Sequence, residues 1–209
     1  VAVGDNGIVL RSTDNASSFS SVSPYYAGTS RGVTFGNNTF VGVSDGGKTG
    51  RSIDNASSWN NSTSGISTTL KGVTFGNNTF VAVGHSGKIL RSTDNASSWN
   101  NSTSPITTDL NGVTFGNNTF VAVGQSGKIL RSSDNASSWD NSTSGISTNL
   151  YGVTFGNNTF VAVGPSGKIL RSTDNASSWN NSTSGISTTL KGVTFGNNTF
   201  VAVGDNGIV

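Results

Sequence analysis

Residues 72–81 read Gly-Val-Thr-Phe-Gly-Asn-Asn-Thr-Phe-Val, and the same ten residues occur five times at intervals of 40. The copies begin at Gly32, Gly72, Gly112, Gly152 and Gly192. A fixed period of this size is the signature of a repeat architecture. The 209-residue chain equals five such periods plus nine residues, and those nine, Val201–Val209, repeat Val1–Val9 letter for letter.

One repeat predicts four short strands and no helix. Strand A covers 72–76, where apolar and small residues alternate with the period of two that favours a strand. Asn77-Asn78 then predicts a turn, because Asn tolerates positive φ. Strand B covers 80–83 and is apolar on both faces. After a Gly-rich turn come strand C at 88–92 and a more polar strand D, which opens at Trp99.

Four short strands in about 40 residues are typical of one propeller blade. An open solenoid is the alternative, but a solenoid needs polar terminal caps, whereas this chain begins and ends with ordinary repeat sequence. We therefore expect an all-β fold: a closed five-bladed β-propeller of 40-residue four-stranded blades, with residues 1–209 as one domain.

The strand inventory predicts how the ring closes. The repeat units are 32–71, 72–111, 112–151 and 152–191, and residues 192–209 with 1–31 form the closing blade. The closing blade is composite, because the chain starts at strand B and ends shortly after a strand A. Its two identical nonapeptides compete for one strand-B position. One copy is therefore displaced or pairs with another molecule, by strand exchange or self-association.

The connection between strands C and D carries a family resemblance. Residues 92–99, Ser-Thr-Asp-Asn-Ala-Ser-Ser-Trp, resemble the Asp-box, Ser-x-Asp-x-Gly-x-Thr-Trp, of BNR and sialidase-like propellers. With the preceding Val-Ala-Val-Gly-x-x-Gly-x-Ile-Leu run, the unit also looks like the repeats of photosystem assembly-factor propellers. Here Ala replaces the usual Gly, and Phe19 replaces Trp in the first copy.

The resemblance implies a structural hairpin, in which the Asp accepts hydrogen bonds from backbone amides and the aromatic residue packs inward. The residues concerned are Asp14, Phe19, Asp54, Trp59, Asp94, Trp99, Asp134, Trp139, Asp174 and Trp179. These aspartates could instead join calcium ligand sets, but backbone capping is the favoured interpretation.

Catalysis has little support in this composition. Sialidases on this scaffold cluster three arginines and activate a Tyr, whereas the strand-C arginines recur once per blade around the ring and the chain has no Glu. The only His, His85, lies in a turn where other repeats have Gln125 and Pro165. Without Cys, and with so few ligand types, the chain predicts no metal or cofactor site. We expect a protein that is not an enzyme.

Two classes of partner are also disfavoured. The net charge of +2 comes from twelve basic residues spread evenly over the repeats, so no basic patch favours nucleic acid. No apolar run is long enough for insertion into a membrane. We favour an extracellular or cell-surface bacterial setting.

Differences between the repeats point to one face of the disc. Between residues 80 and 200 the repeats differ at seven positions, and five of these fall in the B–C turn or the D–A loop. In an up-and-down meander these two connections share one face. Loops on a rigid scaffold are where binding residues usually lie, although drift in exposed loops would leave the same pattern. The candidate ligand-binding residues are Arg31, Lys71, His85, Asp109, Asn111, Gln125, Asn149, Tyr151 and Lys191.

The preferred functional hypothesis is a multivalent lectin-like module, in which repeated weak sites bind carbohydrate through avidity. The tryptophans named above could stack on sugar rings, although the core is their favoured place. The alternative is a protein–protein interaction scaffold, or a recently amplified or designed propeller with no specific ligand. The expected partners are thus glycans or another protein.

Overall fold

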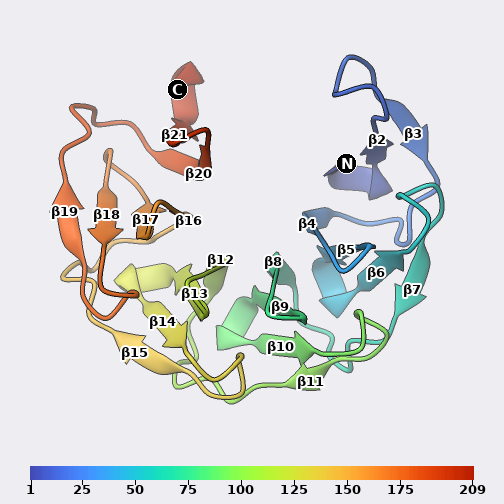
Figure 1. The fold of residues 1–209 in the computed structure, drawn as a ribbon, viewed down its shortest axis with the longest axis horizontal. Helices are drawn as coiled ribbons and strands as arrows, with labels where there is room; N and C mark the ends of the chain where they lie inside the picture. Colours follow the sequence, from blue (N-terminus) through green and yellow to red (C-terminus); the bar gives the residue numbers. More distant parts are fainter.

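A computed structural model describes all residues, 1–209, as strands joined by turns, loops and short 3₁₀ segments. Six antiparallel sheets stand around a central opening (Figure 1). The incomplete sheets at the two ends are β1 (Ala2–Val3), β2 (Val9–Arg11) and β3 (Ser20–Val22), and β20 (Leu190–Gly196) with β21 (Thr199–Gly204). The 3₁₀ segments are Asp5–Gly7, Asp45–Gly47, His85–Gly87, Gln125–Gly127 and Asp205–Gly207.

Four sheets are complete four-stranded meanders. The first two are β4 (Ser30–Gly36), β5 (Thr39–Ser44), β6 (Thr49–Ser52), β7 (Asn60–Ser62), and β8 (Leu70–Gly76), β9 (Thr79–Gly84), β10 (Ile89–Ser92), β11 (Asn100–Asn101). The others are β12 (Leu110–Gly116), β13 (Thr119–Gly124), β14 (Ile129–Ser132), β15 (Asp140–Ser142), and β16 (Gly152–Gly156), β17 (Thr159–Val163), β18 (Ile169–Ser172), β19 (Asn180–Ser182). The predicted all-β propeller architecture is confirmed, with strand A innermost and strand D outermost (Figure 1).

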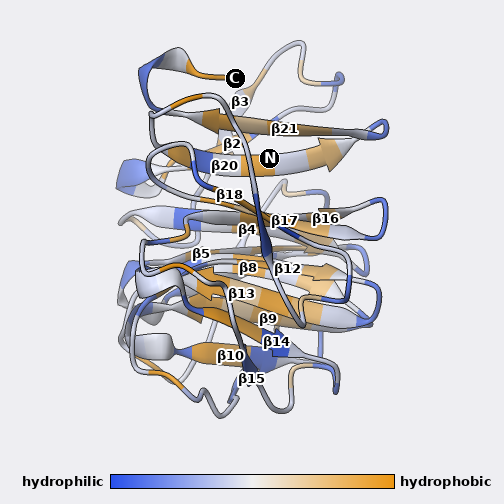
Figure 2. Ribbon diagram, turned by 90° about the vertical axis from the view of Figure 1, so that its left-hand side faces the viewer, coloured by the Kyte–Doolittle hydropathy of each residue, from blue (hydrophilic) through white to orange (hydrophobic).

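The turns separate the molecule into two faces, as the meander predicts. Asn77 and Asn78 both have positive φ, 46° and 54°, and form the tight A–B turn. The Asn77 side chain donates to Asn135 Oδ1 in the C–D turn of the next blade (3.3 Å). On the opposite face, the B–C turn meets the D–A loop, where Gln125 N donates to Asp109 O (2.9 Å). Polar loops therefore cap both ends of apolar strands (Figure 2).

The core lies between the sheets. In the interface between the β8–β11 sheet and the β12–β15 sheet, Val81 and Val83 of the first sheet pack against Phe120 and Trp139 of the second. Phe120 and both valines are fully buried, and Trp139 is 5% exposed. Full burial of a side chain of this size contributes roughly 1.5–3 kcal/mol relative to exposure. Equivalent clusters join the neighbouring blades. Each sheet therefore buries its apolar residues against its neighbouring sheets.

The predicted composite blade is not formed in this structure. Strand β20 pairs with β21, which contains the first four residues of the second nonapeptide copy, while β1 pairs with β2 in a separate sheet. Figure 1 shows the two terminal sheets facing each other across an opening in the ring. Each copy of the nonapeptide pairs with the strand adjacent to it in the sequence, β1 with β2 and β21 with β20, and neither copy is displaced. A closed ring of five blades stays a prediction.

The Ser-x-Asp turn between strands C and D is held by its aspartate. Asp94 accepts hydrogen bonds from Ser98 N (3.0 Å), Ser98 Oγ (2.6 Å) and Ser92 Oγ (2.7 Å). Ala96, where the Asp-box has Gly, adopts a positive φ of 58° and donates its amide to Ser92 Oγ (3.0 Å). Trp99 is nearly buried, at 8% exposure. The capping geometry is the one that the resemblance implies, whereas kinship with BNR repeats stays a prediction.

Strand-C arginines tie each blade to the next. Arg91 Nε donates to Asn135 O (2.7 Å), and Arg131 Nε donates to Asn175 O (3.1 Å), in both cases 44 residues ahead. Arg11 Nε makes the same contact with Asn55 O (2.6 Å). Arg51 reaches the next blade differently, because its terminal nitrogen donates to Ser97 Oγ (2.7 Å). The arginines are therefore distributed around the ring in structural contacts and do not converge on a shared ligand.

The first unit contains a compensated change in the core. Gly50 stands where other repeats have Leu, and a Cβ at Gly50 would lie 2.1 Å from the ring of Tyr25. Tyr25 fills this space, is 5% exposed and lies 5.4 Å from the Trp59 ring centroid. Its hydroxyl hydrogen-bonds Ser44 Oγ (2.8 Å), and burial raises the pKa of this phenol. Nothing local in the sequence pairs Tyr25 with Gly50.

Acid should weaken the fold through the Ser-x-Asp turns. Hydrogen bonds from the Ser178 side chain, the Ser178 amide and Ser172 lower the pKa of Asp174 to about 2. Because the folded pKa lies below the unfolded value, the stabilisation is complete above about pH 4 and is lost as the pH falls toward 2. We expect the melting temperature, followed by circular dichroism, to fall in that window. Asp174→Ala should lower it at pH 7 but barely at pH 2, and an equal loss at both would contradict this mechanism.

Substitutions at Tyr25 and Gly50 should show that the two positions share one space in the core. Tyr25→Ala leaves a cavity and should lower the free energy of unfolding by about 3 kcal/mol, as large-to-small core changes do. Gly50→Leu should be harmful beside Tyr25 yet restore part of the loss in the Tyr25→Ala background. Urea titration of the four proteins in this double-mutant cycle measures the coupling. Additive effects would show that the two positions do not share one space.

Candidate functional site

The candidate residues that directly precede the first Gly of the repeated decapeptide surround the central opening. We call these five residues the axial ring: Arg31, Lys71, Asn111, Tyr151 and Lys191. They lie close together because the A strands of successive blades pack side by side. Lys71 Nζ donates to Asn111 Oδ1 (3.0 Å), and Lys191 Nζ lies 4.8 Å from the Tyr151 ring centroid. Two pairs of neighbouring ring residues are therefore in direct contact across the boundary between blades.

Asp109 contacts Lys71 of the axial ring and two further predicted residues. It accepts hydrogen bonds from Lys71 Nζ (3.1 Å) and Gln125 Nε2 (3.2 Å), and His85 Nε2 lies 3.5 Å away. Burial acts to raise the pKa of Asp109, but the hydrogen bond from the Ser86 amide and the Lys71 ammonium outweigh it and lower the pKa. The carboxylate therefore links the B–C turns of two blades, and His85 is half-exposed beside it.

The remaining predicted residues lie in separate local contacts. Asn149 Oδ1 accepts Ser126 N (3.0 Å), and repeats in the next blade the role of Asp109 toward the B–C turn. Arg31 forms a two-point pair with Asp45 (2.6 and 2.9 Å), which lowers the pKa of that carboxyl. Lys191 also approaches Asp205, at 3.7 Å. Each charged candidate on this face thus has a partner of opposite charge or a polar neighbour.

Four lysines on the same face have no acidic partner. Lys48, Lys88, Lys128 and Lys168 follow the B–C turns, and none of the ion pairs includes them. We call the face with the B–C turns and D–A loops the variable face. It carries seven of the twelve basic residues and four of the ten aspartates. Comparison of repeats missed these lysines because all four complete units have Lys at this position. Their lack of paired acids was the available signal.

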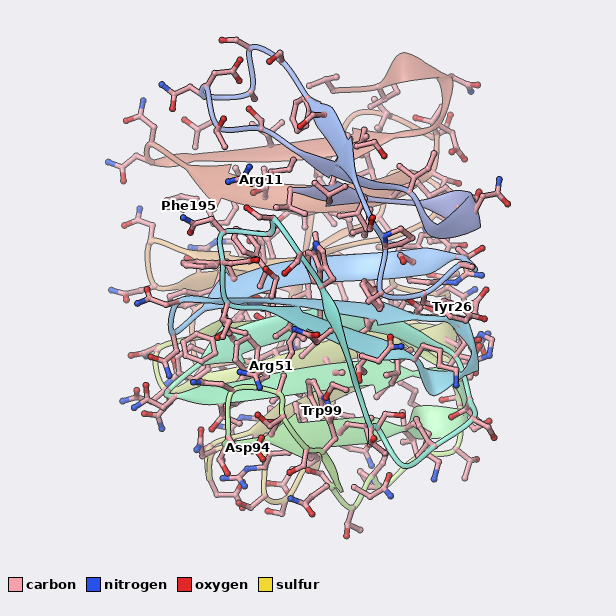
Figure 3. The ribbon with its side chains drawn as sticks, turned by 90° about the vertical axis from the view of Figure 1, so that its right-hand side faces the viewer. Arg11, Tyr26, Arg51, Asp94, Trp99 and Phe195 are labelled. Atoms are coloured by element: carbon pink, nitrogen blue, oxygen red, sulfur yellow. The ribbon has the colours of Figure 1, made fainter.

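A groove of about 870 Å³ opens on the variable face beside the first complete blade. Its lining includes Tyr25, Tyr26, Lys48, Ile66 and Lys88, together with backbone and hydroxyl groups of the D–A loop. Figure 3 shows Tyr26 on one face of the disc and Asp94 toward the opposite face. Tyr25 and Tyr26 stand where later repeats have a Gly or Pro and an Ile, so the groove arises from the irregular first unit. Sequence reasoning did not find it.

The exposed groups of this face are suited to recognition of a ligand. No cluster of three or more His, Asp, Glu or Cys side chains could hold a metal ion. No helix is long and apolar enough to cross a bilayer. Trp99, Trp139 and Trp179 are 5–8% exposed, so their ring faces are covered by the core. Lysines, tyrosines and hydroxyls remain as the groups that a ligand can meet.

Solved structures with a similar fold are propellers of low sequence identity. YCF48 bound to D1 peptide is 16% identical with a TM-score of 0.73, over 97% of this chain and 70% of that one. YCF48 from Cyanidioschyzon merolae is 17% identical with a TM-score of 0.75, over 98% and 76%. The WD40 β-propeller domain of Doa1 is 12% identical with a TM-score of 0.67, over 85% and 62%. At these identities the likeness shows the fold alone.

Family membership rests on the sequence match. No curated protein matches the chain. The family description that does match is the DUF6242 beta propeller domain, over residues 54–192, which is about two thirds of the chain and includes three of the four complete sheets in full. The repeats, the sheets and this match agree, and the chain belongs to the DUF6242 β-propeller domain family.

Proposed function

We propose that this propeller is a protein-interaction scaffold that binds an acidic peptide segment of its partner on the variable face. The observation that carries the proposal is the groove near Tyr26, where Lys48 and Lys88 lie without acidic partners. Unpaired ammonium groups beside an open groove favour a ligand that brings carboxylates.

The groove has the size and lining that a short peptide needs. Its volume of about 870 Å³ falls within the range of about 300–1,000 Å³ typical of ligand pockets. Tyr26 and Ile66 offer apolar contact area, while the hydroxyls and backbone of residues 61–68 offer hydrogen-bonding groups. An extended acidic segment can therefore meet apolar, polar and cationic groups together.

The rest of the variable face enlarges this surface. The axial ring and Asp109, His85, Gln125 and Asn149 differ between blades, so a bound protein would contact distinct residues around the opening. The Lys191 side chain is 53% exposed and lies over the Tyr151 ring. We assign them to the outer part of the same partner footprint.

Peptide binding also has support by analogy. A solved propeller of the same fold is YCF48 bound to D1 peptide. Fold likeness alone does not transfer a ligand, so the groove itself must carry the argument. Carbohydrate binding has less support, because three of the four tryptophans that could stack on sugars, Trp99, Trp139 and Trp179, are buried in the core.

Fluorescence anisotropy with labelled peptides tests the proposal. We expect Asp/Glu-rich octapeptides to bind, and their Asn/Gln counterparts to bind at least about tenfold more weakly. The double variant Lys48→Gln/Lys88→Gln should weaken binding of the acidic peptides by about tenfold, since each exposed ion pair contributes up to about 1 kcal/mol. Added salt should weaken binding further by screening.

Lys128→Gln is the matched control, because Lys128 occupies the same repeat position outside the groove. It should leave the affinity unchanged. If the acidic peptides and their amide counterparts bind equally, or if all three lysines contribute alike, the groove is not the site. Binding on a glycan array without peptide binding would favour the lectin-like hypothesis instead.

A further inference from the structure

Arg51 departs from the contact that other strand-C arginines make with the next blade. Arg11, Arg91 and Arg131 each donate Nε to a backbone carbonyl of the C–D turn that follows. Arg51 instead donates a terminal nitrogen to Ser97 Oγ (2.7 Å), and its buried Nε has no hydrogen-bond partner. A buried donor without an acceptor is unfavourable, and more so when the group is charged. The next blade therefore leaves part of this guanidinium without an acceptor.

No carboxylate of the chain pairs with Arg51. It takes part in none of the ion pairs. The aspartates of the two adjacent C–D turns, Asp54 and Asp94, accept hydrogen bonds from serines of their own turns. A guanidinium binds a carboxylate well because it can donate two parallel hydrogen bonds to it. Arg51 therefore remains available to a carboxylate from outside the chain.

Ile53 is an exposed apolar side chain in an otherwise polar turn. It is 66% exposed. The equivalent residues of the other repeats are all polar, namely Thr13, Thr93, Ser133 and Thr173. A single exposed apolar residue needs no explanation by itself. Ile53, however, lines the same hollow as Arg51, so this turn places an apolar and a cationic group at one position of the surface.

The hollow beside Arg51 has a volume of about 210 Å³. Its lining residues are Arg51, Ile53, Asn60, Asn61, Ser62 and Ser97. Figure 3 shows Arg51 away from Tyr26, toward the face of the disc that carries Asp94. Pockets that hold a whole small molecule begin at about 300 Å³. The smaller hollow therefore suits one or two side chains of a longer ligand.

The hollow adjoins the groove of the proposed function. Asn61 and Ser62 line both of them. Thr49 lines the groove and Arg51 lines the hollow, and the two residues lie on one face of β6. Two residues of a strand span roughly 7 Å. An extended peptide that leaves the groove over β7 therefore reaches Arg51 within two or three residues.

We propose, on the basis of the proposed function, that the acidic partner segment continues from the groove over β7 into this hollow, where it places a carboxylate against Arg51 and an adjacent apolar side chain against Ile53. The carboxylate supplies the acceptor that the guanidinium lacks, and the apolar side chain covers Ile53. The partner motif is then an acidic cluster with an apolar–acidic pair two or three residues away. Arg51 and Ile53 select for that pair, whereas Lys48 and Lys88 select for charge alone.

Fluorescence anisotropy with a core peptide and its extensions tests the motif. The core peptide has four acidic residues. One extended peptide adds Ser-Ser-Leu-Glu after the core, and another adds Glu-Leu-Ser-Ser before it, so that both directions of binding are covered. The extended peptide of the correct direction should bind about five- to tenfold more tightly than the core. One exposed ion pair accounts for up to about fivefold, and burial of the Leu adds to it. Extension with Ser-Ser-Ser-Gln should add nothing.

Substitutions at the hollow should affect the extension alone. Arg51→Gln and Ile53→Thr should each remove most of the gain and leave the affinity for the core peptide unchanged. Both variants should fold, because Arg51 makes one side-chain hydrogen bond and Thr is the residue that most repeats have at position 53. Arg91→Gln is the matched control, since Arg91 holds the same repeat position in the next blade, and it should preserve the gain.

The Nε–H signal of Arg51 in a proton–nitrogen NMR spectrum reports the contact directly. Arg51→Gln identifies this signal by its disappearance. The extended peptide should shift it, because Nε then gains an acceptor, and should leave the Nε–H signal of Arg91 in place. The core peptide should shift neither signal.

The outcomes separate this inference from the proposed function. The core peptide can bind through Lys48 and Lys88 while neither extension adds affinity, or the gain can survive Arg51→Gln. In either case the hollow is not part of the footprint, and only this inference is wrong. If neither the core peptide nor its extensions bind, the proposed function and this inference are both wrong.

Discussion

The face-to-face packing of one sheet on the next is the interaction on which the whole molecule depends. At the inner strands this contact has almost no spare space: a Cβ on Gly76 would lie 2.1 Å from the Phe115 ring of the next blade. Only glycine lets the aromatic ring approach the neighbouring backbone so closely. Because interiors are close-packed, the same Gly and Phe at every repeat also impose the same spacing between blades.

The two faces that meet between consecutive blades carry different side chains. The first and last sheets of the chain therefore expose different residues. The face of each blade that meets the following blade carries small β-branched side chains such as Val81 and Val83. The face of that following blade which they contact carries Phe120 and Trp139. Arginines reach in the same sense, always from a blade to the one that follows. In a stack with nearest-neighbour contacts, the first and last units expose different faces. The exposed Phe19 and Val203 follow from this directionality.

Local chemistry explains which parts of the fold were predictable. The Asn77-Asn78 turn, the four strands and the two loop faces follow from residues adjacent in sequence, and the structure has them all. Among the candidate residues, Lys71, His85 and Asp109 do meet, because strand order alone brings their loops together. Ring closure was not predictable in this way. It depends on the rotation between sheets, which arises from packing between residues some 40 positions apart.

The groove and the altered core of the first unit have one physical origin. An identical repeat produces identical sites, so a single distinct site requires a unit that differs. Gly50 and Thr49 replace larger apolar residues, and the space admits Tyr25 into the core while Thr49 and Tyr26 line the groove. Substitutions in contact are coupled: Tyr25 cannot enter while Leu occupies position 50, and Gly50 alone would leave a cavity. The core change and the groove are therefore coupled through Tyr25, which fills the space at Gly50 and also lines the groove.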